Sequence, residues 1–110
     1  MAILVQFTQS GLTSKTYDDI KARVGWEADP PTGAMFHAVG FDGDTMHAVD
    51  VWDTAENMRR YYDQRFAPVA GELGVALADP GLCEIHLMAT VPDLLLKSAE
   101  DVSRATRADG

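Results

Sequence analysis

The stretch GAMFHAVGFDGDTMHAVDVWD, which runs from Gly33 to Asp53, constrains the fold of this chain more than any other segment. Polar and apolar residues alternate on both sides of the Asp42-Gly43 pair, and Asp-Gly is a strong signal for a two-residue hairpin turn. The sequence therefore predicts two antiparallel strands that meet at this turn. Two of the three histidines of the chain lie in the hairpin with an aspartate and a tryptophan, so it is also the first candidate for a functional site.

Two more strands and a first helix are predicted outside this hairpin. Residues 2–8 have the β-branched and aromatic content of a strand, and residues 82–89 alternate as a half-buried strand does. A helix is expected to begin near Thr13 or Ser14, whose hydroxyls can cap free N–H groups, and its apolar face includes Tyr17.

The second helix is predicted to follow the hairpin directly. Asp53 and Glu56 have the spacing of a capping box, and Pro68 is expected to kink the helix because it has no N–H donor. The resulting order, β-α-β-β-α-β, predicts an α+β, ferredoxin-like fold with a four-stranded antiparallel sheet and two helices on one face. Residues 1–91 are assigned to this domain. Residues 92–110 are expected to form a C-terminal extension, a short helix followed by a frayed tail.

The second face of this sheet is expected to be apolar as well. Val49 and Val51 point to the opposite side from Met46, Ala48 and Trp52, because successive side chains of a strand alternate. An apolar sheet face on a small domain usually marks an interface. The sequence therefore predicts a homodimer in which two sheets pack face to face about a two-fold axis.

Charge and cysteine content argue against several classes of partner. Seventeen acidic residues against nine basic residues give a net charge of −8, so neither nucleic acid nor an anionic membrane is expected as a partner. Cys83 is the only cysteine, which excludes an intramolecular disulfide and favours a reducing, cytoplasmic location. No apolar run approaches the ~18 residues that a membrane span needs. The histidines have no metal-ligand spacing, and neither a metal nor another cofactor is expected.

The register of the hairpin decides which of its side chains meet. A turn at Asp42-Gly43 places His37 on the same face as Asp50 and Trp52, and a turn at Gly43-Asp44 preserves that grouping. A three-residue loop would instead place His37 beside His47 on the other face. The two-residue turn is the preferred interpretation. The face that it defines consists of Met35, His37, Val39, Met46, Ala48, Asp50 and Trp52.

A carboxylate beside an imidazole suggests acid–base chemistry on this face. Asp50 could orient the ring of His37 and poise it as a general base near neutral pH. The alternative is that both residues only satisfy structural hydrogen bonds, for example to Tyr61 or Tyr62. His86 alternates with apolar residues in the last predicted strand, and its spacing is compatible with either the pocket or the dimer interface.

The hairpin and the segment after it resemble a known family. FHAVGFDGDTMHAVDVWD runs into TAENMRRYYDQRFAPVAGELG, which is similar to the W-[DE]-[ST]-x-E and F-x-P-x-x-x-x-x-G motifs of dimeric α/β-barrel proteins related to antibiotic-biosynthesis monooxygenases. The resemblance covers residues 2–89 and implies a ferredoxin-like fold that pairs into a dimeric barrel. The chemistries that it implies include cofactor-free oxidation of polyphenols, haem degradation, lactone isomerisation and polyketide cyclisation.

The same resemblance assigns Trp52 to a pocket between the sheet and the helices. Haem-degrading relatives use an asparagine on the first strand and an iron-ligating histidine on the second helix. This chain has Gln6 on the first strand and no histidine between Thr54 and Leu73, so haem ligation by that route is not expected.

Two function classes remain open at this point. The first is a homodimeric enzyme that acts on a small aromatic or polyketide-like substrate by cofactor-independent oxygenation, cyclisation or isomerisation, with His37, Asp50 and His86 as catalytic residues. The second is a non-catalytic dimeric module that binds a ligand or a protein partner. The substrate-binding residues predicted for the first class are Met35, Trp52, Tyr61 and Tyr62.

Overall fold

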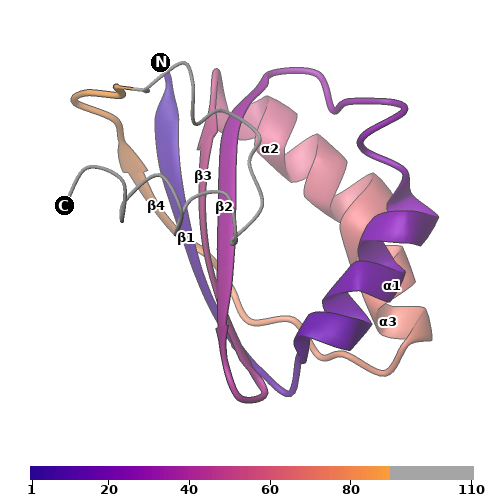
Figure 1. The fold of residues 1–110 in the computed structure, drawn as a ribbon. Coiled ribbons are helices and arrows are strands. Elements are labelled where there is room, and N and C mark those ends of the chain that lie inside the picture. The colour runs from indigo at the N-terminus through magenta and orange to yellow at the C-terminus, as the bar shows by residue number, and fades with distance from the viewer. Residues whose placement is uncertain (90–110) are drawn as a thin grey trace, which may run out of the picture.

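A four-stranded antiparallel sheet carries the helices on one of its faces (Figure 1). The computed structural model describes residues 1–89, and within them the strand order is β2-β3-β1-β4. This order confirms the predicted α+β, ferredoxin-like fold. The predicted domain boundary at residue 91 and the predicted extension at 92–110 lie outside the described residues. The strands are β1 (Ile3–Ser10), β2 (Ala34–Asp42), β3 (Thr45–Trp52) and β4 (Gly81–Glu84), and the helical segments are α1 (Ser14–Val24), α2 (Ala55–Tyr61), η1 (Tyr62–Phe66) and α3 (Ala67–Glu72).

Helix α1 begins and ends where its sequence predicts. The Thr13 hydroxyl accepts a hydrogen bond from the backbone N–H of Thr16. This bond satisfies a donor in the first turn that has no carbonyl acceptor within the helix. At the other end, Gly25 adopts the left-handed conformation (φ 70°) and donates its N–H to the carbonyl of Lys21. Tyr17 is buried on the inner side of this helix.

The second helix starts with a different cap from the one predicted. Thr54, not Asp53, is the N-cap, and its hydroxyl accepts a hydrogen bond from the backbone N–H of Asn57. The Asp53 carboxylate instead accepts hydrogen bonds from the side-chain amide of Asn57, at 2.9 and 3.2 Å. Threonine is an effective N-cap in its own right, so the predicted pairing of Asp53 with Glu56 is not needed.

The second helix is interrupted before Pro68 rather than at it. Residues Tyr62–Phe66 form a π-helical turn, in which the N–H of Ala67 reaches the carbonyl of Tyr62, five residues earlier. Pro68 then lies in the first turn of α3, where the missing N–H costs no hydrogen bond. The irregularity therefore takes the form of a widened turn and not of a proline kink.

Strand β4 is shorter than the predicted strand at 82–89. It pairs only with β1, and the register places Glu84 opposite Ile3, the first residue of β1. One more hydrogen bond follows, from the N–H of Ile85 to the carbonyl of Ala2. Residues after Ile85 have no β1 residue opposite them, because β1 begins at Ile3. The alternating pattern of residues 86–89 therefore does not form a strand.

The β2–β3 hairpin has the two-residue turn at Gly43-Asp44, since Asp42 pairs with Thr45. Gly43 has a φ of 60°, which favours glycine. This turn is the alternative that preserves the predicted grouping, and it brings His37 directly opposite Asp50. An irregularity in the register between Ala34 and Phe36 interrupts the pairing near the start of β2.

The buried side chains form two clusters under the helices rather than one. The larger cluster includes Leu12 and Ile20 near the hairpin end of the sheet, and the smaller one consists of Val5, Trp52 and Met58. Phe7 packs against both. The division leaves room between the sheet and the helices for a cavity that members of both clusters line.

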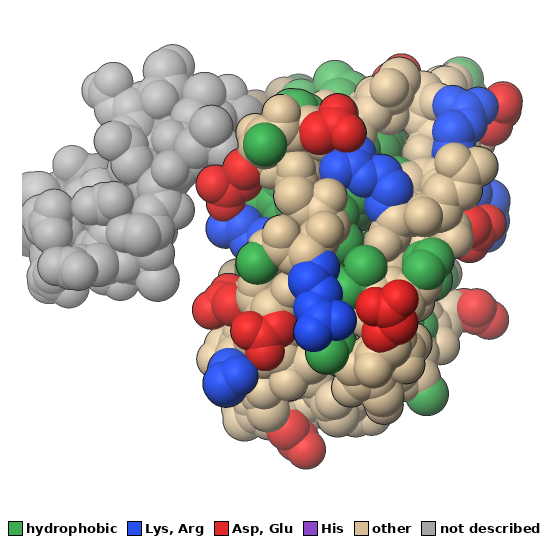
Figure 2. Space-filling view, turned by 90° about the vertical axis from the view of Figure 1, so that its right-hand side faces the viewer, with side chains coloured by type: hydrophobic (Ala, Val, Ile, Leu, Met, Phe, Trp, Pro, Cys, Tyr) green, Lys and Arg blue, Asp and Glu red, His purple; other side chains and the backbone are tan. Residues whose placement is uncertain are grey.

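The outer surface of the helices is polar. Figure 2 shows acidic and basic side chains interspersed on this side of the molecule. Ion pairs within the helices include Lys15–Asp19 and Glu56–Arg60. Exposed pairs of this kind contribute little to stability. No helix in residues 1–89 is long and apolar enough to cross a membrane.

Gly33 lies in the loop before β2 and is hydrogen-bonded to Asp53, just before the N-cap of α2. Its replacement is predicted to destabilise the fold. Its φ is 88°, its carbonyl accepts the N–H of Asp53, and a Cβ there would overlap the Asp53 carboxylate and lie 2.8 Å from the Asn57 amide. Gly33→Ala should lower the free energy of unfolding by about 1–3 kcal/mol in urea denaturation. Gly40→Ala is the matched control, because a Cβ there meets no atom within 4 Å. Equal stability of both variants would contradict this reading.

Candidate functional site

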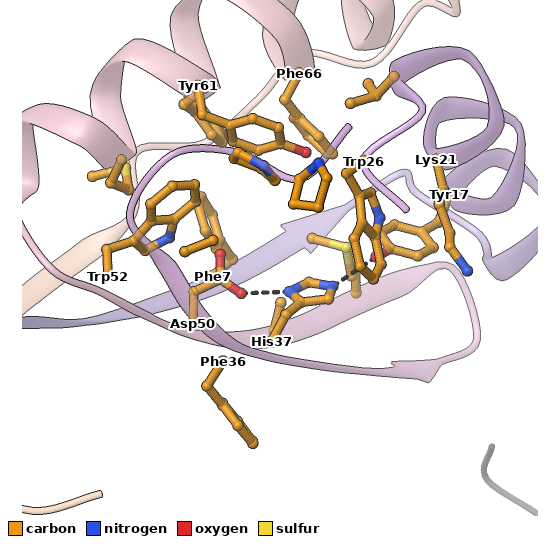
Figure 3. A pocket seen from close by; sticks show the side chains of 18 of the residues that line it. Phe7, Tyr17, Lys21, Trp26, Phe36, His37, Asp50, Trp52, Tyr61 and Phe66 are labelled. Atoms are coloured by element: carbon orange, nitrogen blue, oxygen red, sulfur yellow. Dashed lines mark hydrogen bonds and ion pairs between the residues drawn. The ribbon is translucent and has the colours of Figure 1, made fainter. Parts of the chain in front are cut away.

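A cavity of about 240 Å³ lies between the sheet and the helices (Figure 3). In Figure 3, Trp52 and Trp26 lie on opposite sides of it, Tyr61 closes it on the helix side, and Asp50 and His37 lie along the sheet. Its walls are therefore largely aromatic, with a short polar row on one side. The aromatic residues that line it include Phe7, Tyr17, Trp26, Trp52, Tyr61, Tyr62 and Phe66.

The polar row is a chain of hydrogen bonds through Asp50, His37 and Tyr17. The Asp50 carboxylate lies 2.5 Å from His37 Nδ1, and His37 Nε2 lies 2.7 Å from the Tyr17 hydroxyl. An ionised carboxylate can only accept, so Nδ1 carries the proton and donates it to Asp50. Nε2 is then the acceptor, and Tyr17 donates to it. The arrangement orients the imidazole from both sides and leaves a basic nitrogen at the cavity.

Each member of the chain comes from a different element. Asp50 is on β3, His37 is on β2 opposite to it, and Tyr17 comes from the inner face of α1. The Asp50 side chain is 15% exposed, whereas the His37 side chain is 35% exposed. His37 is thus the member that a molecule in the cavity can reach most easily.

Burial keeps the cavity tyrosines protonated. Desolvation is the main cause that raises the pKa of the Tyr17 hydroxyl well above its usual value, with neighbouring Tyr61 and Asp50 adding to it. Desolvation also raises the pKa of Tyr61 to about 12 and that of Tyr62 to about 12. At neutral pH, Tyr17 is therefore a hydrogen-bond donor.

Tyr62 differs from Tyr17 in its hydrogen bonding. Its ring stacks between Phe7 and Phe66, at centroid distances of 5.3 and 5.5 Å. Its hydroxyl is buried and has no hydrogen-bond partner among the described residues. Tyr62 therefore contributes an aromatic wall, whereas Tyr17 contributes a hydroxyl to the polar row.

Trp26 forms the wall opposite Trp52, a position that the sequence pattern does not predict. Its ring meets His37 edge-on, with centroids 6.1 Å apart and an interplanar angle of 72°. Lys21 Nζ lies 5.4 Å from the centroid of Trp26, and the same ammonium pairs with Glu27. The only signal in the sequence is a tryptophan directly after a helix-ending glycine, and this pattern does not say where the ring points.

The structure brings most of the predicted site residues to one cavity. His37 and Asp50 are in contact there, as described above, and the four predicted substrate-binding residues also line the cavity: Met35, Trp52, Tyr61 and Tyr62. His86 is exposed, lies beyond the end of β4 and is not among the lining residues. His47 is exposed on the opposite face of β3. The functional roles of these residues stay predictions.

Metal binding finds no ready ligand set in this part of the chain. Within residues 1–89, no group of three or more histidine, cysteine, aspartate or glutamate side chains lies close enough to hold an ion. The polar row contains one imidazole and one carboxylate, and they hydrogen-bond each other.

The raised tyrosine pKa values predict a loss of stability at high pH. The chain has three tyrosines, and all of them line the cavity. Between about pH 10 and pH 12 the folded protein keeps phenolic protons that the unfolded chain loses, so the free energy of unfolding falls as the pH rises. Absorbance at 295 nm should show no phenolate at pH 10 in the folded protein. In guanidinium chloride, half of the tyrosine should be ionised near pH 10. A folded-state midpoint near pH 10 would contradict the burial of these hydroxyls.

Comparisons with known proteins identify the fold. No family model and no curated protein sequence matches this chain. Among solved structures, a protein from Chloroflexus aurantiacus J-10-fl that is provisionally assigned as an antibiotic biosynthesis monooxygenase superimposes with a TM-score of 0.59 at 14% identity, covering 82% of this chain and 98% of its own. SnoaB, a cofactor-independent oxygenase from Streptomyces nogalater, superimposes with a TM-score of 0.55 at 19% identity, covering 83% of this chain and 96% of SnoaB.

MupZ from Pseudomonas fluorescens is similar to the same extent, with a TM-score of 0.56 at 9% identity and with 86% of this chain and 92% of MupZ covered. Identities this low relate the folds and not the activities. The chain therefore has the ferredoxin-like fold of the antibiotic biosynthesis monooxygenase-like domain proteins.

Proposed function

We propose that this protein is a cofactor-independent oxygenase that binds a small aromatic or polyketide-like substrate in the cavity and takes a proton from it with His37. The observation that carries the proposal is the Asp50–His37–Tyr17 chain along an aromatic-walled cavity. Hydrogen bonds that fix the tautomer and orientation of an imidazole are typical of histidines that act as general bases. The fold shared with SnoaB, which is described as a cofactor-independent oxygenase, supports the same class of reaction.

The size and lining of the cavity support an aromatic substrate. An apolar cavity of about 150 Å³ takes up benzene, so the 240 Å³ present here suits a system of two or three fused rings. Trp52 and Tyr61, whose centroids are 5.4 Å apart, offer ring faces and edges to such a molecule. Few other polar side chains line the cavity, so a polar or acidic group of the substrate would bind at the row formed by Asp50, His37 and Tyr17.

The chemistry starts with proton transfer. An acidic phenol or an activated C–H of the substrate would give its proton to His37 Nε2, taking the place of the Tyr17 hydroxyl as the donor to that nitrogen. Asp50 would stabilise the imidazolium that forms, because its carboxylate already accepts from Nδ1. Tyr17 would then be free to donate its hydroxyl proton to the developing anionic oxygen of the substrate.

Molecular oxygen is the oxidant in the second step. For an anthrone, loss of a methylene proton gives an electron-rich anion that transfers its electrons to O₂. One oxygen atom becomes the new quinone carbonyl, and the other leaves as water together with the two hydrogens of the methylene group. The substrate supplies the electrons, so the residues of the chain need only move protons and exclude water.

Oxygen uptake with anthrone tests this proposal. His37→Gln should lower the protein-dependent rate by about 100-fold or more, because the general base is lost. Tyr17→Phe should lower the rate by a smaller factor and leave the fold intact. His47→Gln serves as the control, since His47 is exposed on the opposite face of the sheet.

Two outcomes would contradict the proposal in different ways. Turnover of a polyketide-like probe at the same rate with and without O₂ would assign the base to isomerisation or cyclisation instead. Tight anthrone binding without turnover in the wild type, and equal binding by His37→Gln, would favour the non-catalytic ligand-binding module.

We further propose that two copies of the chain pair through the face of the sheet that carries no described helix. Figure 3 shows Phe36 pointing away from the cavity, and Phe36 and Val49 are 38% and 37% exposed. Val51, which is itself buried, opposes Leu4 and Phe36 in the register, so apolar side chains lie side by side across three strands of this face. Contiguous apolar surface of this kind supports a self-complementary interface about a two-fold axis.

Val49→Lys is predicted to disrupt this dimer, because it would bury an unpaired ammonium group from each subunit in the interface. Light scattering coupled to size exclusion should report twice the 12.0 kDa chain mass for the wild type and the single mass for the variant. Thr8→Lys, a substitution of an exposed residue near the hairpin end of the same face, is the control. A wild-type protein of single mass at micromolar concentration would overturn the dimer proposal.

We also propose that the protein is located in the cytoplasm. The single cysteine of the chain, Cys83, is an exposed free thiol. A reducing compartment preserves such a thiol, which supports this assignment.

A further inference from the structure

The loop between α1 and β2, residues 25–33, forms one wall of the cavity. It contributes Trp26, Pro30 and Pro31 to the lining, and Trp26 is the residue that contacts His37. A loop is ordinarily the more mobile part of a fold, so the position of this wall depends on what fastens the loop.

Arg65 fastens this loop to the second helix. The side chain comes from the π-helical turn η1, and its Nη2 donates hydrogen bonds to the carbonyls of Val24, at 3.0 Å, and Asp29, at 2.9 Å. The guanidinium also lies 3.8 Å from the Asp29 carboxylate and 5.5 Å from the centroid of Tyr61. Only 26% of the side chain is exposed, so solvent competes weakly for these donors.

The two carbonyls lie on either side of Trp26. Val24 is the last residue of α1 and Asp29 is three residues beyond Trp26, so one guanidinium nitrogen holds both ends of the segment that carries the indole. Because the backbone is fixed at both ends, the indole is held edge-on against the ring of His37. A lysine at position 65 has a charge but not the planar fork of donors that arginine offers.

The π-helical turn directs Arg65 toward the loop. Widening the turn by one residue places Tyr61 and Phe66 near each other on the cavity side, with ring centroids 6.5 Å apart. Arg65 lies beside them, over the Tyr61 ring. Single π-turns occur frequently at functional sites, and here the turn brings the fastening residue and the cavity wall together.

We propose that Arg65 is a positioning residue for this site: by holding residues 24–29 it fixes Trp26 against His37 and keeps that side of the cavity closed. The consequence for substrate binding rests on the proposed function, whereas the position of the loop does not. The ligand class that this arrangement suits is a planar aromatic molecule enclosed between Trp26 and Trp52.

Fluorine NMR of the full-length protein labelled with 5-fluorotryptophan tests the position of the loop directly. The chain has two tryptophans, so two resonances are expected, and Trp26→Phe assigns them. In Arg65→Met, the Trp26 resonance should move toward the position of an exposed indole, and its solvent isotope shift should at least double, while the Trp52 resonance stays in place. Arg59→Met is the matched control, because Arg59 is an exposed arginine on the neighbouring turn.

Binding of 2-naphthol provides the second readout. Loss of the two hydrogen bonds that order the loop should weaken the affinity of the protein for 2-naphthol about ten-fold in Arg65→Met. The affinity should fall less in Arg65→Lys, which keeps the positive charge and N–H donors but not the planar guanidinium. If Arg65→Met fails to fold, the same fluorine measurement on Arg65→Lys decides the question, with an intermediate Trp26 shift expected.

Two results would overturn the inference: an unchanged Trp26 resonance in a folded Arg65 variant, or an equal shift in Arg59→Met. Failure of the wild type to bind 2-naphthol would count against the proposed function instead, and the fluorine result would still decide the role of Arg65.

Discussion

In the β2–β3 hairpin His37 lies directly opposite Asp50, and the rest of the site is arranged around that pair. The pairing depends on a two-residue turn at Gly43-Asp44, because side chains in a strand alternate with a period of two. A slip by one residue would move His37 to the other face of the sheet and leave the Asp50 carboxylate without its partner. Tyr17 of α1 can complete the row only because the register holds His37 under that helix.

The cavity exists because the apolar core is divided. One cluster packs α1 and α3 against the hairpin end of the sheet, the other packs α2 against the opposite end, and the aromatic residues between them do not close the gap. Polar groups at such a position are costly unless they are hydrogen-bonded. Both nitrogens of His37 have partners, so the row is formed before any ligand binds, and a substrate has to displace only the Tyr17 hydroxyl from Nε2.

The sequence predicts the parts of this site that depend on strand periodicity and misses those that depend on docking. His37, Asp50 and Trp52 could be grouped because either two-residue turn keeps the same parity. Tyr17 could be assigned to the inner face of its helix, but its partner depends on how that helix lies on the sheet. The roles of Trp26 and Arg65 depend on a loop and on a π-helical turn, and neither has a periodic signal. The last strand was predicted too long because alternation does not report where its pairing partner ends.

A crystal structure of the full-length protein with 2-naphthol bound tests the central claim most directly, because it reports which side chains the ligand meets. The naphthol rings are expected between Trp52 and Trp26, with the naphthol oxygen within hydrogen-bonding distance of His37 Nε2 and the hydrogen bond between His37 and Asp50 intact. Naphthol bound on the outer face of the sheet, or bound in the cavity with its oxygen directed away from His37, would contradict the account.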